Sequence, residues 1–179
     1  MDTRERRCAA MAALIKQQGK LGRTAMMKLL YFLQELRSVD LGYNFTLYTY
    51  GPFDSDVLED LSYASALGVL RSQVVHYSGG YGYDIEPGDC AENIAADFER
   101  EHQEDVDWTL KHFGSRGAAG LELDSTLVFV DREAQEAGIG ISDHDLVDRV
   151  KAIKPRFEKT EIEERLSFLR SLGVPEATP

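Results

Sequence analysis

The segment at residues 24–36, TAMMKLLYFLQEL, constrains the fold most, because its apolar side chains occupy almost the whole circumference of a helix. Its apolar residues include Met26, Met27, Leu30, Tyr31, Phe32 and Leu33. A helix that is apolar nearly all round needs other elements against every face. The sequence therefore predicts a central core helix with Thr24 as its N-cap, in which the methionines and aromatic residues pack the core rather than hold a cofactor.

The segments on either side of this helix predict further regular structure. Residues 3–18 have helically spaced apolar positions. Residues 44–50, NFTLYTY, alternate aromatic and β-branched residues, which is typical of a strand. The Gly51-Pro52 corner ends that strand, since proline has a fixed φ and no amide donor.

Residues 54–87 predict a short helix and a hairpin. Asp54 or Ser55 caps the helix, and Leu67 lies on its inward face. Two strand-like runs then flank Gly79-Gly80, which is a hairpin signal.

The order of these elements resembles a winged-helix arrangement. From residue 89 onward the chain looks helical, including 118–136, where the flanks of a short LVFV run favour helix over strand. We therefore expect an α+β, mainly α-helical fold. Its winged-helix-like part (1–88) is followed by a helical bundle (89–179), packed together as one compact domain.

The net charge of −11 is unevenly distributed along the chain. The first 30 residues carry seven Lys and Arg against two acids, whereas the rest carries thirteen bases against twenty-nine acids. Most of this surface repels free nucleic acid. We therefore expect a protein partner that is basic or that acts on nucleic acid or nucleotides, rather than nucleic acid itself.

Two sets of residues are candidates for contact with a partner. The helix before the hairpin, which reads the major groove in winged-helix proteins, begins with four acids and contains no base. The candidate protein-binding residues are Asp54, Asp56, Glu59, Asp60, Tyr48 and Tyr50. The candidate nucleic-acid contacts are Arg4, Arg6, Arg7, Lys16, Lys20 and Arg23.

The sequence contains no recognisable motif for catalysis, a metal or a cofactor. Cys8 and Cys90 stand far apart and outside any C-x-x-C motif, and a reducing cytoplasm is their simplest location. The Gly79-Gly80 region lacks the Lys-Ser/Thr pair of a phosphate-binding loop. We expect a cytoplasmic protein that is not an enzyme, with no cofactor, no metal, no signal peptide and no transmembrane helix.

Two segments of the first third resemble the Panacea domain of SocA-like antitoxins. That family has a Lys-Leu-Leu-Tyr-Phe helix followed by a Tyr-Gly-Pro corner, which match residues 28–32 and 50–52 here. Residues 121–133 and 145–173 are similar to the related YwgA-like group of uncharacterised prokaryotic proteins. The resemblance implies a bacterial, archaeal or phage protein without a known catalytic site, whose relatives neutralise toxins mostly by direct binding.

These observations support one leading hypothesis and two alternatives. The first is a protein-binding module, an antitoxin-like neutraliser or adaptor that sequesters a toxin or defence effector. The alternatives are a DNA-binding transcriptional regulator, which would use the basic N-terminal residues, and an accessory subunit of a larger prokaryotic defence complex. A homodimer through an apolar-rich helix such as 118–136 stays open.

Overall fold

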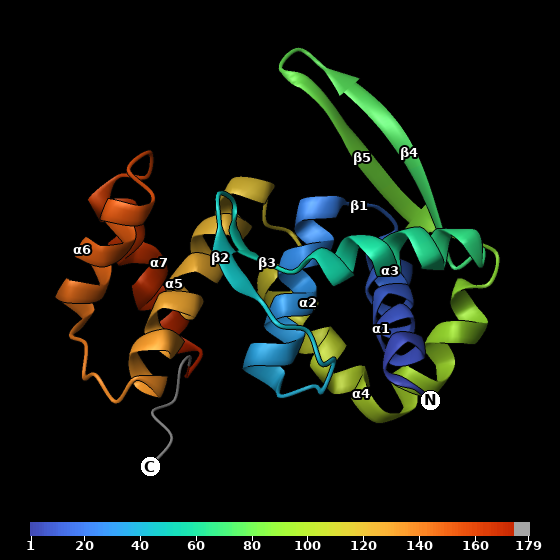
Figure 1. Cartoon of the computed structure of the whole chain (residues 1–179), viewed down its shortest axis with the longest axis horizontal. Coiled ribbons are helices and arrows are strands. Elements are labelled where there is room, and N and C mark those ends of the chain that lie inside the picture. Colours follow the sequence, from blue (N-terminus) through green and yellow to red (C-terminus); the bar gives the residue numbers. More distant parts are fainter. Residues whose placement is uncertain (174–179) are drawn as a thin grey trace. The chain divides into compact units, whose positions relative to one another are not determined.

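The computed structural model describes residues 1–173, apart from the side chain of Tyr77, and is mainly α-helical with small antiparallel sheets (Figure 1). The described elements are α1 (Thr3–Gln18), β1 (Leu21–Gly22), α2 (Arg23–Arg37), β2 (Thr46–Tyr48), β3 (Gly51–Phe53), α3 (Ser55–Ala66), β4 (Leu70–Tyr77), β5 (Gly80–Pro87), α4 (Ala91–Phe113), α5 (Ala118–Glu136), α6 (Asp143–Ile153) and α7 (Lys159–Ser171). The predicted α+β class with a predominance of helix is confirmed.

The described chain packs into two compact units. Unit 1 contains residues 1–45 and 54–118, and unit 2 contains residues 46–53 and the chain from residue 119 onward. The expected boundary after residue 88 does not coincide with this division, because α4 packs against α1 and α2. The expectation of one compact domain with parts 1–88 and 89–179 stays a prediction, and residues 174–179 lie outside the described chain.

Helix α2 lies in the core of unit 1, as its apolar circumference predicts. Its buried residues run from Met26 to Leu33. The ring of Phe32 stacks on Phe113 of α4 with centroids 4.1 Å apart, and Tyr31 meets Phe45 edge-on at 5.1 Å. The predicted N-cap at Thr24 is wrong, because the helix begins directly after the short strand β1 and has Gly22 in the cap position.

A three-stranded antiparallel sheet completes unit 1. Its strand order is β1-β5-β4, with Leu21 opposite Ile85 and Leu70 opposite Pro87. Strands β4 and β5 form a long hairpin that extends away from the helices of unit 1 (Figure 1). The predicted hairpin is therefore confirmed.

The strand predicted over residues 44–50 is shorter than expected. Only Thr46–Tyr48 form β2, because the amides of Tyr43 and Asn44 bond to the side chains of Gln34 and Asp54 instead of a neighbouring strand. The Gly51-Pro52 corner does not end the extended structure either. It begins β3, which pairs antiparallel with β2 across a tight turn in unit 2.

Gly51 is required at the start of β3 for two reasons. Its φ of 85° is a conformation that side-chain-bearing residues rarely adopt. A Cβ at this position would also lie 3.1 Å from the hydroxyl oxygens of both Ser125 and Thr126 on α5. The hairpin of unit 2 therefore lies directly against the backbone and small side chains of α5.

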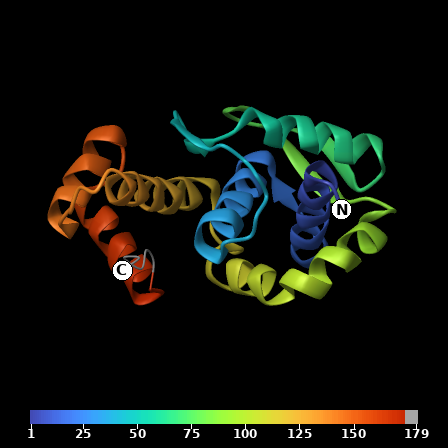
Figure 2. The same ribbon diagram turned by 60° about the horizontal axis from the view of Figure 1, so that its bottom comes forward.

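Helix α5 spans the residues predicted for it and carries three buried acids in unit 2, where α5, α6 and α7 group together (Figure 2). Each acid has a basic partner from α7 or from the chain between α6 and α7. The pairs are Glu122 with Lys154 (3.0 Å) and Arg156 (2.5 Å), Asp124 with Arg165 (2.8 and 2.9 Å), and Asp131 with Arg170 (2.5 Å). Because a buried carboxylate needs such a partner, these ion pairs hold the C-terminal helices in register with α5.

Candidate protein-interaction surface

The acidic start of α3 is built around the cap residue Asp54. Its carboxylate accepts hydrogen bonds from the amide of Asp56 at 2.9 Å and from the amide of Asn44 at 2.6 Å. The cap predicted at Asp54 or Ser55 is thus found at Asp54. The carboxylate of Asp54 therefore accepts from backbone amides of the chain itself. Its negative charge also stabilises α3, because helix N-termini attract negative charge.

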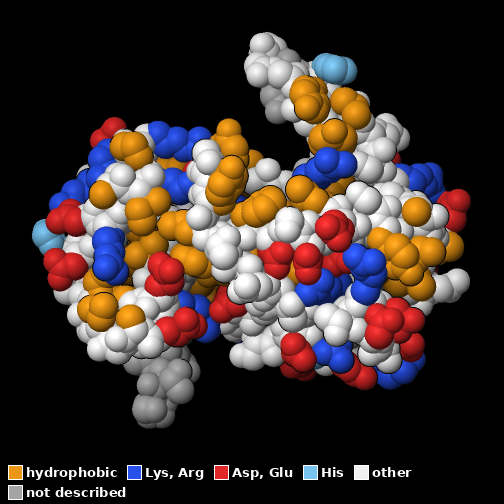
Figure 3. Space-filling view, in the orientation of Figure 1, with side chains coloured by type: hydrophobic (Ala, Val, Ile, Leu, Met, Phe, Trp, Pro, Cys, Tyr) orange, Lys and Arg blue, Asp and Glu red, His pale blue; other side chains and the backbone are white. Residues whose placement is uncertain are grey.

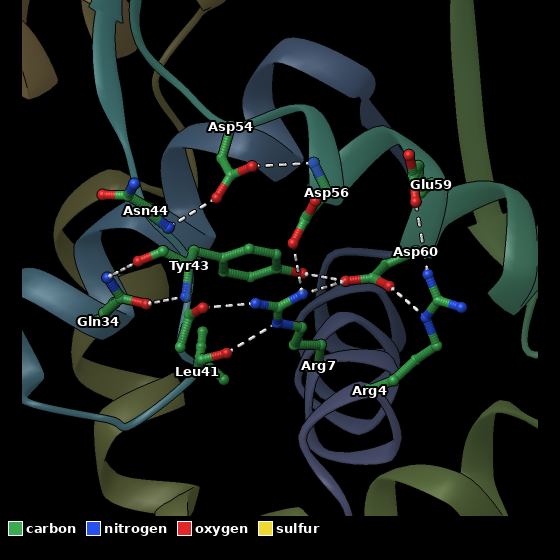
Figure 4. Close-up of polar contacts among 11 residues, drawn as sticks. Arg4, Arg7, Gln34, Leu41, Tyr43, Asn44, Asp54, Asp56, Glu59 and Asp60 are labelled. Carbon is green, nitrogen blue, oxygen red and sulfur yellow. Dashed lines mark hydrogen bonds and ion pairs between the residues drawn. The ribbon is translucent and has the colours of Figure 1, made fainter.

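Asp60, one turn further along α3, is completely buried. Its carboxylate accepts from Nε of Arg4 at 3.0 Å, from Nη1 of Arg7 at 3.4 Å and from the hydroxyl of Tyr43 at 3.1 Å (Figure 4). Burial and the negative charge of Asp60 raise the pKa of Tyr43, so its hydroxyl keeps the proton that it donates. Asp60 therefore faces the chain's own cations instead of solvent.

Arg7 of α1 is the buried counterpart of these acids. Its Nη1 also lies 3.1 Å from the carboxylate of Asp56, and its other donors reach the carbonyls of Leu41 and Gly42 at 2.8 and 2.5 Å. The guanidinium lies over the ring of Tyr43, 4.1 Å from its centroid. Arg7 thus ties α1 to α3 and to the loop that follows α2.

The two candidate sets are therefore largely partners of each other within unit 1. Arg4 also pairs with exposed Glu59 at 3.6 Å, so three of the four candidate acids contact Arg4 or Arg7. The residue types had suggested two binding surfaces of opposite charge. The structure brings them together as an internal network, and their roles in binding a partner stay predictions.

The other candidate bases have acidic partners with one exception. Arg6 pairs with Asp40, Lys16 with Glu92 and Glu99, and Lys20 with Asp84 and Glu86. Among the described residues Arg23 forms no ion pair, and its guanidinium lies over the ring of Tyr83 at 3.3 Å. Five of the six bases therefore already have their charge balanced.

The two candidate tyrosines belong to unit 2, whereas the four acids belong to unit 1. Tyr48 ends β2 and Tyr50 lies in the turn before β3, and both side chains are exposed. The ring of Tyr48 contacts Phe53 across the hairpin, with centroids 5.7 Å apart. Their exposure is compatible with binding a partner, which stays a prediction.

Sequence reasoning missed a groove in unit 1, which we call the apolar groove. It has a volume of about 410 Å³ and is lined by residues of α1, α3 and α4, with Val69 after α3. Its rim carries Tyr63, Leu67 and Ile94, whose side chains are 40%, 49% and 38% exposed. Hydrophobic side chains gather around the C-terminal end of α3 in Figure 3.

The expectation that Leu67 lies inward is therefore wrong. Leu67 follows the last residue of α3 and sits in its C-cap position, where it no longer continues the buried face of Val57 and Leu61. A signal for the groove was present in the sequence, since Tyr63 and Leu67 stand one helical turn apart. Ile94 also interrupts the acidic run of α4.

Acidic residues flank the apolar groove. Glu5 and Asp97 line it directly. Further exposed acids continue along α4, and these are Glu92, Glu101, Glu104 and Asp107. Glu101 and Glu104 form no ion pair among the described residues, so this ridge carries charge that the chain does not balance.

Cys8 of α1 lines the apolar groove and is buried. Burial, reinforced by the carboxylate of Asp60, raises the pKa of its thiol to about 11. Since the thiolate is the reactive form, we expect Cys8 to resist alkylation at neutral pH, while exposed Cys90 reacts. Ellman's reagent should therefore detect one rapidly reacting thiol in the native chain and two after unfolding. A native Cys90→Ser variant that still reacted rapidly would contradict this assignment.

No described helix is both long and apolar enough to cross a membrane. Within residues 1–173, His, Cys, Asp and Glu side chains do not gather into a group of three or more that could hold a metal ion. A comparison with protein-family models and a search of curated proteins found no match for this chain.

Proposed function

We propose that this chain is a non-enzymatic protein-binding module, an antitoxin-like neutraliser or adaptor that sequesters a basic partner protein in the cytoplasm. The observation that carries the proposal is the apolar groove with Tyr63, Leu67 and Ile94 on its rim, together with exposed acids further along α4 that form no ion pair among the described residues. Grouped apolar side chains at a polar-rimmed groove are typical of protein interaction sites. Aromatic and aliphatic side chains in such places often supply most of the binding energy.

Charge defines the class of partner. The net charge of −11 and the acidic ridge of α4 attract a basic protein over distances of about a Debye length, roughly 8–10 Å at physiological salt. A toxin that acts on RNA or nucleotides commonly carries the basic surface that this ridge would match. The partner segment we propose has apolar side chains for the groove and flanking Lys or Arg for Glu101 and Glu104.

We also propose that unit 1 is a winged-helix scaffold adapted to protein binding. Its order of helix, strand, two helices and a two-stranded hairpin supports this, as does the sheet order β1-β5-β4. In DNA-binding members of this class the helix before the hairpin enters the major groove. Here that helix is α3, whose exposed face carries Asp56, Glu59 and Tyr63 and no base.

The resemblance to the Panacea domain supports the antitoxin-like role within this proposal. The matching helix residues 28–32 form the core of unit 1, and Gly51 of the Tyr-Gly-Pro corner occupies a position that only glycine fits well. Both matches have a structural reason in this chain. They support a shared scaffold, and the toxin-binding role follows from the family as an expectation.

Binding can be tested with the protein encoded beside this gene, if that protein is toxic when expressed alone. We expect co-expression of the full chain to restore growth and the two proteins to co-purify. The double variant Tyr63→Ala, Leu67→Ala should bind about tenfold to a hundredfold more weakly, because truncating central apolar contacts commonly costs 1–3 kcal/mol. Isothermal titration calorimetry measures the change in dissociation constant.

Val74→Ala is the matched control, since Val74 is an exposed apolar residue on β4 outside the groove. Equal affinity of the groove variant and the wild type would place the interface elsewhere and remove the main support for the proposal.

A second variant, Glu101→Lys with Glu104→Lys, should lower the association rate and its salt dependence without unfolding the chain, because both residues are exposed.

The DNA-binding alternative is separated from this proposal by a gel shift with the gene's own promoter region at two salt concentrations. The internal ion pairs of Arg4, Arg7 and Lys16 weigh against it, because these charges are already balanced by acids. An accessory subunit of a defence complex would use the same groove. It would co-purify with its partner without rescuing growth from a toxin.

A further inference from the structure

A second cavity of unit 1 lies where the hairpin meets the start of α2, and we call it the basic cavity. Its volume is about 650 Å³, which falls within the range of roughly 300–1,000 Å³ typical of small-molecule sites. Its walls are the end of α1, β1, the first turn of α2, the middle of β5 and the chain between α4 and α5. It shares no residue with the apolar groove.

The charges that line the basic cavity are mostly positive. Arg23 and Arg116 face it together with Lys20, which is balanced by its ion pair with Asp84. The first turn of α2 adds to this, because it contains no acid and no side chain caps its amides. Three of the four charged residues that line the cavity are therefore basic, in a chain whose overall charge is strongly negative.

Arg23 supplies an independent indication of a ligand. Its Nε is buried and has no hydrogen-bond acceptor among the described residues. A buried donor nitrogen without an acceptor is costly even in a side chain that is only partly buried, and an anionic oxygen in the cavity is the kind of acceptor that would satisfy it. The ring of Tyr83 holds the guanidinium from one side at 3.3 Å, which fixes its position for such a contact.

Aromatic residues of β5 indicate that a ligand of this cavity also has a flat ring. Tyr81 and Tyr83 line the cavity, and Tyr81 is 62% exposed. Their rings lie edge to face, with centroids 6.1 Å apart. An exposed ring beside a cationic cavity is suited to stacking a nucleobase, which every base can do through its flat face.

We propose that the basic cavity binds a small phosphate-bearing ligand of the nucleotide class. The phosphate lies against Arg23, Arg116 and the first amides of α2, and the base stacks on Tyr81. A nucleic-acid chain fits less well, because Asp84 and Glu86 lie on the same strand and the wider surface is acidic. This site is independent of the protein-binding role, since it uses a different surface of unit 1.

Calorimetric titration of the full chain at low salt with ATP, AMP and inorganic phosphate tests the proposal. We expect saturable binding of ATP, weaker binding of AMP and phosphate, and a rise in melting temperature with ATP concentration. Arg23→Gln should weaken ATP binding about tenfold to a hundredfold, because a charge-assisted hydrogen bond is lost. Arg100→Gln, which removes an exposed arginine outside the cavity, is the matched control and should change nothing.

Tyr81→Ala separates base stacking from phosphate binding. It should not destabilise the fold, because Tyr81 is exposed. It should weaken ATP binding several-fold and leave phosphate binding unchanged. No heat and no thermal shift with any of the three probes at millimolar concentration would overturn the proposal. Equal losses in Arg23→Gln and Arg100→Gln, or binding of single-stranded DNA in preference to ATP, would overturn it as well.

Discussion

Replacing Asp60 with alanine is expected to lower the free energy of unfolding by about 3 kcal/mol, because the change removes one partner of a buried ion pair. Arg7 would keep its buried guanidinium, and Tyr43 would lose the acceptor of its hydroxyl. The loss should lie at the lower end of the usual 3–5 kcal/mol range. The reason is that Arg7 retains Asp56 and the carbonyls of Leu41 and Gly42.

Urea unfolding followed by circular dichroism measures this loss. The matched control is Glu59→Ala on the same helix. Glu59 is exposed, and its ion pair with the exposed Arg4 is long, at 3.6 Å. Exposed pairs contribute little, so the control should unfold near the wild-type midpoint. Asp60→Asn should fall between the two, because it keeps hydrogen-bonding capacity without the charge. Equal midpoints for Asp60→Ala and Glu59→Ala would show that the buried network does not stabilise the chain.

Replacing Glu122 with alanine should destabilise the chain by about 3–5 kcal/mol, because it leaves Lys154 buried without an anion. The side chain of Lys154 is 5% exposed, and its ammonium also donates to the carbonyl of Thr49 in the β2–β3 turn. The second partner of Glu122, Arg156, is half exposed and can turn to solvent when the carboxylate is removed. The effect should therefore come mainly from Lys154.

The control for this variant is Glu133→Ala, an exposed acid on the same helix α5. Its unfolding midpoint in urea should stay close to that of the wild type. A double variant, Glu122→Ala with Lys154→Met, should recover part of the loss, because it removes both buried charges together. Suppose instead that the losses of the two single variants, Glu122→Ala and Lys154→Met, simply added up in the double variant. The two side chains would then not stabilise the fold as a pair.

The internal use of charge changes which residues are good candidates for contact with a partner. Charge reversal at Asp56 or Asp60 would disturb folding and binding together, because both bond to Arg7. Glu101, Glu104, Tyr63 and Leu67 are better test positions, because they are exposed. The proposed protein-binding role therefore rests on the apolar groove and the ridge of α4 rather than on the start of α3.

Local patterns determined much of the secondary structure. The all-round apolar character of residues 26–33 predicted a core helix, since only surrounding elements can cover such a helix. Gly79-Gly80 between strand-like runs predicted the β4–β5 hairpin, and Asp54 was one of the two residues predicted to cap the helix before it. These features depend on interactions between residues close in sequence, which is why one sequence suffices to find them.

The sequence alone determined that this protein has a helical core, a glycine-turned hairpin and an acidic composition that disfavours contact with free nucleic acid. Only the tertiary structure decided where its charges go. Arg7 and Asp60 stand 53 positions apart, and Arg165 and Asp124 stand 41 apart. A charge pattern cannot show whether an acid faces a partner or an arginine of its own chain. That depends on which helices pack together, and so does the apolar groove, whose residues meet only when α1, α3 and α4 assemble.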